Sequence, residues 1–478
     1  MLFAQKHDYN WIFGYGPTAP GFGNSILDFN SIPPNISNID LNIYFRSCGG
    51  TMSDSVGNLM FFTNGIRIYN KSNEVMEGGD TINPGPVWNS QQDYGYVSIY
   101  PIFGLPKPSS DNIYYLFHSD VVNANGTSFV QHLYYSIIDM NANNGLGKVL
   151  EKNIVLMEGN LMWPSAVKHG NGRDWWIMGL QESDTKQYLF LLSKDGISGP
   201  FVQDIGPLFD TIEYAGKSLF SEDGSLYLRH DTNKALRLYD FDRCTGQLSN
   251  LRIIPHNPEE YPSWNAAFSP DDRFLYLNRP GWVRTFDLAE MDFQPTYDTL
   301  ATWELNFCPS YPFPSSYLFC QLGPDGKIYY SNASSTRCLN VVNKPTFPGQ
   351  SADCEEAGFA LPGFNDLTLN QFPNYRLGEW DDSPCDTINF QKPGDGFFAN
   401  EYSPGQSSQV DRSYTLLPPI PGSPCKGCTE RDLEILKNPM SLVHALLVLK
   451  TTGRLPDDWP TEQAERDGIY LAEPPQRE

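Results

Sequence analysis

The sequence is poor in basic residues. Its 478 residues include 33 Lys and Arg against 56 Asp and Glu, a net charge of −23, and charged residues make up only 19% of the chain. A charge of this sign repels phosphate backbones and anionic membrane surfaces. We therefore exclude nucleic acid as a partner.

Long apolar runs are also missing. The longest apolar block, Leu442–Leu449, is too short to span a bilayer, which needs about 20 residues, so we expect no membrane span. The N-terminal stretch Met1–Gln5 is too short for a signal peptide. Its Phe-Ala-Gln ending is nevertheless typical of the end of one. We expect a secreted or outer-surface protein whose signal peptide is truncated here, with a cytosolic start as the alternative.

Familiar catalytic patterns are absent too. The chain has no G-x-S-x-G, H-E-x-x-H, Walker or dinucleotide-binding motif. Its seven histidines are scattered, and adjacent acid pairs such as Glu259-Glu260 point to opposite faces of a strand. The sequence therefore predicts no catalytic residue, no metal ligand and no cofactor, although distant acids could still converge in a folded ring.

Nine cysteines, an odd number, leave at least one without an intramolecular partner. Neighbours such as Cys308 and Cys320, or Cys338 and Cys354, could pair across short loops in an oxidising compartment. The isolated Cys425-Lys-Gly-Cys428 has no further close ligands for zinc, so we interpret it as a disulfide or as incidental.

What the sequence does contain is a repeat. Ser221-Glu-Asp-Gly-Ser-Leu-Tyr-Leu228 is matched by the segments from Ser269 and from Gly323, and weaker copies lie upstream. Each is a polar Asp-Gly-type turn followed by an alternating apolar strand, a strong hairpin signal. The turn residues are spaced by 54, 60, 52, 48 and 54 positions, as read from Gly57, Asp111, Asn171, Asp223, Asp271 and Asp325. A period near 50 residues is typical of a four-stranded propeller blade.

Six blades are explicit, and the two ends of the chain can supply a seventh. Asn10–Gly14 and Ile26–Phe29 are interpreted as later strands of a blade whose first strand comes from Leu367–Tyr375. Such closure removes unpaired sheet edges. We predict an all-β fold, a single β-propeller with seven blades favoured and six as the alternative.

The propeller is predicted over residues 8–376. Residues 377–427 are a turn-rich linker, and 428–478 form a C-terminal segment with one amphipathic helix that opens at Thr429.

Several motifs in one order resemble the exported propeller proteins of Bacteroidetes, which are usually followed by a type IX secretion sorting domain. The motifs are Val56–Gly65, His169–Trp176, Asp240–Gly246, Gly323–Tyr329 and Gln371–Gly378. The resemblance covers about residues 8–390 and implies an exported or cell-surface propeller. It supplies no catalytic residues, and no sorting domain is evident after residue 400.

Three polar groupings invite a chemical role, but local structure explains each of them better. His169 with Asp174 is expected to brace its blade turn. His118 with Asp120 is expected to end a strand, and Asp240-Phe-Asp242 lacks the remaining ligands of a calcium loop.

One regularity among the aromatic residues suggests a ligand site. Trp163, Tyr214, Trp264 and Tyr317 lie 7 to 9 positions before a turn residue, where the innermost strand of a blade begins. An aromatic rim there would suit stacking on sugars or capture of a cation. The competing interpretation is that the four rings pack between blades.

The sequence therefore predicts a binding or adhesion scaffold for a glycan or protein ligand at the propeller face. The alternative is a propeller glycoside hydrolase or lyase with acids converging on the central channel. We lean away from an enzyme, and the fold itself does not decide because propellers include both.

Overall fold

The computed structural model describes residues 5–16, 22–41, 43–98, 101–124, 127–182, 184–206, 217–230, 235–255, 265–293, 297–302, 308, 315–380 and 385. All of these belong to the first of two compact units, residues 1–406. The predicted C-terminal helix and most of the predicted linker lie outside the described residues.

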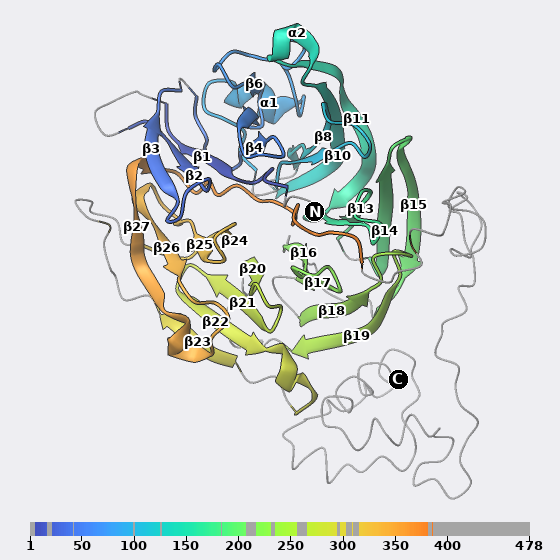
Figure 1. Cartoon of the computed structure of the whole chain (residues 1–478), viewed down its shortest axis with the longest axis vertical. Helices are drawn as coiled ribbons and strands as arrows, with labels where there is room; N and C mark the ends of the chain where they lie inside the picture. Colours follow the sequence, from blue (N-terminus) through green and yellow to red (C-terminus); the bar gives the residue numbers. More distant parts are fainter. Residues whose placement is uncertain are drawn as a thin grey trace, which may run out of the picture. The chain divides into compact units, whose positions relative to one another are not determined.

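Seven antiparallel sheets follow one another around a ring in sequence order (Figure 1). Blades 1 and 2 comprise β1 (Asn10–Gly14), β2 (Asn24–Asp28), β3 (Asn35–Ile39) and β4 (Gly50–Ser53), β5 (Leu59–Thr63), β6 (Ile68–Asn70). Blade 3 comprises β7 (Phe103–Pro106), β8 (Ile113–Ser119), β9 (Val122–Ala124), β10 (Thr127–Asp139) and β11 (Lys148–Leu161). The prediction of a seven-bladed, all-β propeller is confirmed.

The remaining blades each have four strands within the described residues. Blade 4 contains β12 (Ser165–Lys168), β13 (Trp175–Leu180), β14 (Lys186–Ser193) and β15 (Gly196–Asp204). Blade 5 contains β16 (Ser218–Phe220), β17 (Leu226–His230), β18 (Ala235–Phe241) and β19 (Leu248–Pro255). Blade 6 contains β20 (Asn265–Phe268), β21 (Phe274–Arg279), β22 (Trp282–Asp287) and β23 (Tyr297–Thr302). Blade 7 contains β24 (Cys320–Leu322), β25 (Ile328–Tyr330), β26 (Thr336–Val342) and β27 (Cys354–Asn365).

Helical structure is confined to short connections among these residues. They are α1 (Pro86–Gln91), α2 (Ala142–Gly145) and two 3₁₀ segments, Leu288–Phe293 and Gly349–Ala352. No helix in the described part of the chain is long and apolar enough to cross a membrane.

The repeated turns form as their sequence dictates. In blade 5 the carboxylate of Asp223 accepts hydrogen bonds from Ser225 N at 2.7 Å and Ser221 Oγ at 2.8 Å. Gly224 follows with φ +74°, a conformation that glycine adopts without strain. The turn fixes the register of the β16–β17 hairpin, where Ser218 lies opposite Arg229.

The antiparallel strand order gives the ring two distinct faces. We call the face where the first strand of each blade begins the entry face, and the face with the first-to-second strand turns the turn face. In each four-stranded blade the last strand ends on the entry face, where the first strand of the next blade begins.

Blade 1 closes differently from the prediction. Its strands β1 and β2 occupy the expected places, but Leu367–Tyr375 forms no strand. The segment still lies beside β1, where Asn370 Oδ1 accepts a hydrogen bond from Ile12 N at 3.0 Å. A side-chain amide thus replaces a ladder bond, and Pro373 has no backbone N–H to donate. We call residues 366–380 the closing strap.

The closing strap runs inward from β27 across the ring (Figure 1). Thr368 Oγ1 donates to Phe45 O, just before the first strand of blade 2, on the entry face. Further on, Asn374 Nδ2 donates to Glu222 O in a blade 5 turn, on the turn face. The closing strap therefore passes through the axis of the propeller from one face to the other.

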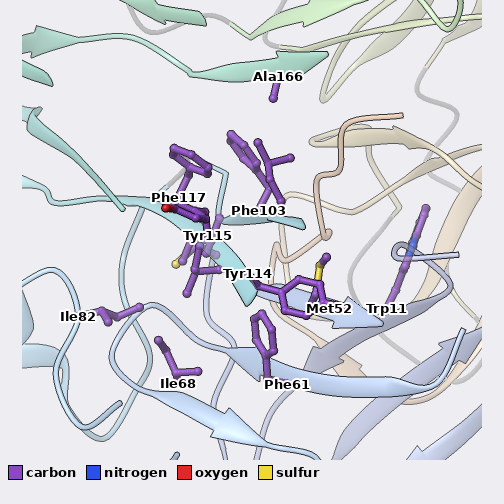
Figure 2. Close-up of a cluster of buried hydrophobic side chains, with 14 of the residues drawn as sticks. Trp11, Met52, Phe61, Ile68, Ile82, Phe103, Tyr114, Tyr115, Phe117 and Ala166 are labelled. Carbon is purple, nitrogen blue, oxygen red and sulfur yellow. The ribbon is translucent and has the colours of Figure 1, made fainter. Parts of the chain in front are cut away.

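Large aromatic and aliphatic side chains fill the space between blades. In the largest cluster, rings from several blades meet around Phe61, Phe103 and Tyr114 (Figure 2). Tyr375 brings the closing strap into the same cluster, with its ring 5.6 Å from that of Trp175. Burial of rings of this size supplies most of the favourable free energy of such a fold.

Candidate functional site

A cavity of about 70 Å³ lies on the axis of the propeller. The first strands of blades 3 to 7 all contribute to its wall, and the closing strap supplies Gln371, Phe372 and Asn374. One water needs about 10–15 Å³ of such space, so the cavity accommodates a few waters or a small chemical group. Its lining combines apolar side chains with polar and charged ones, and polar groups among apolar residues are a feature of binding sites.

The most unusual side chain in this lining is Lys217, which is only 6% exposed. Its ammonium Nζ donates to Cys320 O at 2.9 Å. Gln371 Nε2 donates to the same carbonyl oxygen at 3.3 Å. Burial lowers the pKa of Lys217 because the charged form loses hydration.

Glu222 is the acid of the cavity. It lines the wall where β16 turns towards β17, and burial raises its pKa to about 7. Asp272 and Asp8 raise that pKa further, whereas Arg376 and Lys217 lower it. At neutral pH the Glu222 carboxyl group is thus close to half-protonated.

Asp272 braces two blades beside Glu222. Its carboxylate accepts hydrogen bonds from Glu222 N at 2.7 Å and Asp223 N at 2.8 Å. Burial raises the pKa of Asp272 to about 7, although both backbone donors favour the ionised form. With one backbone donor on each oxygen, this carboxylate serves the contact between blades 5 and 6.

An ion pair holds the turn-face end of the closing strap. Arg376 Nη1 lies 2.7 Å from Asp8 Oδ2 and 2.9 Å from Asp8 Oδ1, and the side chain of Asp8 is 2% exposed. Burial raises the pKa of Asp8, and the guanidinium of Arg376 opposes that shift. Lys168 lies nearby, with Nζ 2.9 Å from Tyr375 O, and burial lowers its pKa to about 8.

Of the four aromatic residues predicted as a ligand rim, the structure describes two, Trp163 and Tyr317, and these lie in different clusters of buried residues. Trp163 lines the axial cavity and contacts Phe319 edge to face at 6.0 Å. Tyr317 is fully buried in another cluster, where its ring meets that of Tyr330 at 5.4 Å. Tyr214 and Trp264 lie outside the described residues. A role of these four residues in ligand binding stays a prediction.

The local interpretation of His169 and Asp174 is confirmed. Asn171 N donates to His169 Nδ1 at 3.0 Å, and Asn171 Nδ2 donates to Asp174 Oδ2 at 2.9 Å. His169 N donates to Asp174 O at 2.8 Å, which closes the turn. These contacts shape the β12–β13 hairpin.

The other two polar groupings also have structural roles. His118 contacts Asn83 Oδ1 at 2.6 Å and Ser136 Oγ at 2.9 Å, and Asp120 contacts His132 Nδ1 at 2.6 Å. Asp242 Oδ1 accepts from Cys244 N at 2.8 Å, forming a turn after β18. No group of three or more potential metal ligands is present among the described residues.

The disulfide pairing differs from both suggested neighbour pairs. Cys308 pairs with Cys338, and Cys244 pairs with Cys385, 141 positions away. Cys320 and Cys354 remain free thiols. Sequence proximity is a poor guide here because the folded ring brings distant segments together, such as the turn after β18 and the chain beyond the closing strap. Cys425 and Cys428 lie outside the described residues.

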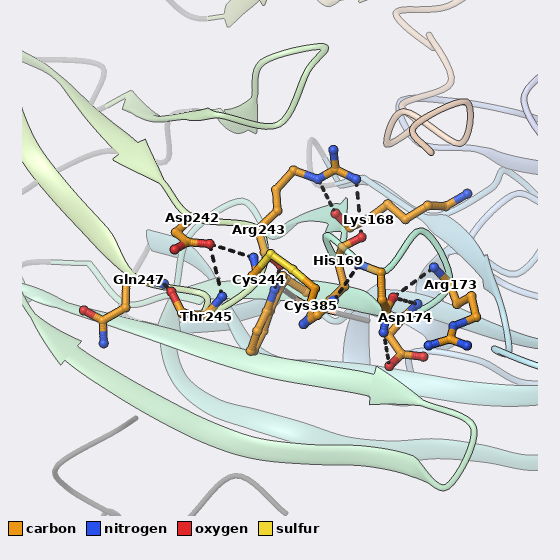
Figure 3. The surroundings of a disulfide bond; sticks show 12 residues. Lys168, His169, Arg173, Asp174, Asp242, Arg243, Cys244, Thr245, Gln247 and Cys385 are labelled. Atoms are coloured by element: carbon orange, nitrogen blue, oxygen red, sulfur yellow. Dashed lines mark hydrogen bonds between the residues drawn. A yellow bond between two sulfur atoms is a disulfide. The ribbon is translucent and has the colours of Figure 1, made fainter. Parts of the chain in front are cut away.

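The Cys244–Cys385 disulfide lies close to His169 and Arg243 (Figure 3). Arg243 donates through Nε to Lys168 O at 2.8 Å and through Nη2 to Gly378 O at 2.7 Å. Trp380 N donates to Gly170 O at 2.8 Å. Covalent and hydrogen-bonded contacts thus fix the chain to the turns of blades 4 and 5.

Sequence reasoning missed Lys217 and Glu222, although the repeat carries a signal for both. Aligned on the turn residue, the position of Lys217 holds Ser165, Asn265 and Phe319 in blades 4, 6 and 7. The position of Glu222 holds glycine or proline in the same three blades, at 170, 270 and 324. A charge at only one copy of a repeated position indicates a local role rather than a requirement of the blade.

Comparisons with known proteins add no family. No family model matches the chain, and no curated protein matches it. A functionally unknown protein from Desulfotomaculum acetoxidans DSM 771 is 13% identical with a TM-score of 0.40 over 75% of this chain and 98% of its own. A protein from Bacteroides uniformis ATCC 8492, provisionally assigned as a 6-phosphogluconolactonase, is 12% identical with a TM-score of 0.45 over 75% and 98%.

A third structure, Chaetomium thermophilum Sqt1 bound to the N-terminus of the ribosomal protein L10, is 10% identical with a TM-score of 0.38 over 70% of this chain and 87% of its own. At these identities and scores, the likenesses carry no inference about function. Fold and site together define the chain as a seven-bladed propeller whose axis is occupied by its own closing strap.

Proposed function

We propose that the protein is an exported or cell-surface propeller that binds a glycan or protein ligand at its entry face. The observation that carries the proposal is the axial cavity, where Trp163 lies in one wall with the buried Lys217 and Gln371. An aromatic ring beside a few convergent polar groups is a common design for recognising sugars and polar side chains.

Export is supported by the covalent chemistry of the chain. Two disulfides persist readily in an oxidising compartment and are rare in a reducing one. The net charge of −23 suits a solvated protein outside the cell. The similarity to exported propellers of Bacteroidetes points to the same compartment.

Glu222 favours a second candidate, the glycoside hydrolase or lyase. A carboxyl group with a pKa of about 7 in an axial cavity is suited to proton transfer at neutral pH. Asp272 is the neighbouring acid that could act as the second catalytic carboxylate. It is poorly suited to that role, because both of its oxygens already accept backbone hydrogen bonds. Release of reducing ends or unsaturated products by the wild-type protein, and its loss in Glu222→Gln, would establish this alternative.

A screen of the purified chain on glycan and protein arrays tests the binding proposal. We expect a defined ligand class to bind, and Trp264→Ala and Trp163→Leu to reduce that binding. Trp163 is 3% exposed, so thermal unfolding must show that its variant remains folded. Trp380→Ala is the matched control, because this tryptophan is 46% exposed beside the β12–β13 turn on the opposite face. Unchanged binding in both the Trp264→Ala and the Trp163→Leu variant would overturn the proposal.

A further inference from the structure

Two buried polar groups of the axial cavity have unused hydrogen-bonding capacity. Lys217 Nζ carries three N–H donors, and its contact with Cys320 O uses one of them. Gln371 is 7% exposed, and its Oε1 accepts no hydrogen bond from any described residue. Both side chains line the cavity and both contact Cys320 O.

The ammonium group also has no close counter-ion among the residues that the structure describes. Within the described residues no carboxylate forms an ion pair with Lys217 within 4.0 Å. Burying a charge without a partner carries a large free-energy cost. Folded proteins therefore avoid it unless the charge serves a function. An apolar residue fills the same position in blade 7, where Phe319 stands, so the fold itself does not require a cation here.

We propose that the axial cavity receives the carboxylate of an acidic sugar, with Lys217 binding the carboxylate and Gln371 Oε1 accepting from a sugar hydroxyl. The inference rests on the proposed glycan-binding function and names its ligand class. A cavity of about 70 Å³ suits a carboxylate group better than a whole sugar ring, so the acid enters first. Trp163 in the wall is placed to contact the apolar face of the ring.

Glu222 makes this binding dependent on pH. Its negative charge repels a bound carboxylate, whereas its protonated form does not. The groups that act on Glu222 are Lys217, Asp8, Asp272 and Arg376, and those that act on Lys217 are Cys320 and Glu222. Lower pH both neutralises Glu222 and favours the ammonium form of Lys217, so both effects strengthen binding in the same direction.

The test is calorimetric titration of the intact chain with D-glucuronate and with D-glucose at pH 6 and pH 8. We expect glucuronate to bind and glucose to bind at least about tenfold more weakly, since glucose leaves the buried ammonium group without a charged partner. Glucuronate binding should weaken between pH 6 and pH 8. Glu222→Gln should reduce that pH dependence.

Variants at the lysine complete the experiment. Lys217→Met should abolish the preference for glucuronate, and Lys217→Arg should retain part of it. Lys194→Met is the matched control, because Lys194 is exposed on the β14–β15 hairpin and pairs with the similarly exposed Asp195. If Lys217→Met fails to fold, the preference of the wild-type protein and the Lys217→Arg result still decide.

Equal binding of glucose and glucuronate, or unchanged glucuronate binding in folded Lys217→Met, would overturn the inference. So would a cavity that holds water only, with no heat from either sugar. If the array finds a neutral glycan or a protein, the proposed binding function stands and this inference fails. If the array finds no ligand at all, the proposed function fails as well.

Discussion

The blades and the closing strap hold their places by different means. Each blade is a ladder of backbone hydrogen bonds, so its geometry depends on the strand pattern rather than on any one side chain. The closing strap has no ladder and depends on individual contacts, such as Asn370 with Ile12 N and Arg376 with Asp8. The difference teaches that single substitutions should matter more in the closing strap than in the blades.

The largest effect is expected at the Arg376–Asp8 ion pair. Arg376→Ala leaves the carboxylate of Asp8 buried without its partner, which should cost about 3–5 kcal/mol in the free energy of unfolding. The blade counterpart is Arg273, which pairs with Asp287 at 2.7 Å but is 49% exposed. Arg273→Ala should have little effect on the free energy of unfolding, because an exposed ion pair contributes little.

Urea unfolding of the two variants measures both values. An Asp8→Asn/Arg376→Met double variant should recover part of the loss, because it removes the buried charge altogether. Equal destabilisation by Arg376→Ala and Arg273→Ala would contradict the comparison between the closing strap and the blades.

The same contrast explains what the sequence could and could not predict. The blades were predictable because Asp223, Asp271 and Asp325 recur at nearly constant spacing, and each turn is built from residues close in sequence. The local roles of His169 and Asp174 were predictable for the same reason. The seven-bladed ring was predictable from the six repeated turns together with the strands near the N-terminus, which supply a seventh blade.

The closing strap and the cavity were not predictable in this way. Asp8 and Arg376 are 368 positions apart and belong to no repeat, so only the folded ring brings them together. Cys244 and Cys385 pair across 141 positions for the same reason. Lys217 and Glu222 break the repeat, but a departure from a pattern does not say where in space the side chain lies.

The next largest effect is expected at the Cys244–Cys385 disulfide. The bond links the chain beyond the closing strap to blade 5, and a loop this long gives a stabilisation of about 2–4 kcal/mol. A Cys244→Ser/Cys385→Ser variant should lose this amount, whereas blades 1 to 3 should keep their amide protection in hydrogen exchange.

The control for this prediction is the second disulfide. Cys308→Ser/Cys338→Ser opens a loop of only 30 residues, so it should cost less. If Cys308→Ser/Cys338→Ser lost more free energy of unfolding than Cys244→Ser/Cys385→Ser, the Cys244–Cys385 bond near the closing strap would matter less than its contacts imply.

The smallest effect concerns the charge of Glu222 at the junction of blade 5 and the closing strap. Folding raises the pKa of Glu222 from 4.5 to about 7, so the folded state binds the proton more tightly. The contribution of this group to stability is therefore fully present below pH 4.5 and is lost as pH rises through 7. Buried His7, His118 and His169 act oppositely, because burial lowers their pKa values to about 4, 3 and 4.

The buried histidines lower the free energy of unfolding as the pH falls below 6.5. The pH dependence of wild-type stability therefore does not isolate the contribution of Glu222. The difference in the free energy of unfolding between wild type and Glu222→Gln isolates it, because glutamine resembles the protonated acid and the histidines are the same in both proteins. The two proteins should be about equally stable at pH 4, and the variant should be more stable by about 2–3 kcal/mol at pH 8. Urea unfolding at both pH values measures the difference. A constant difference across this range would mean that Glu222 titrates as an ordinary exposed acid, and that the axial cavity hydrates its carboxylate as well as bulk water does.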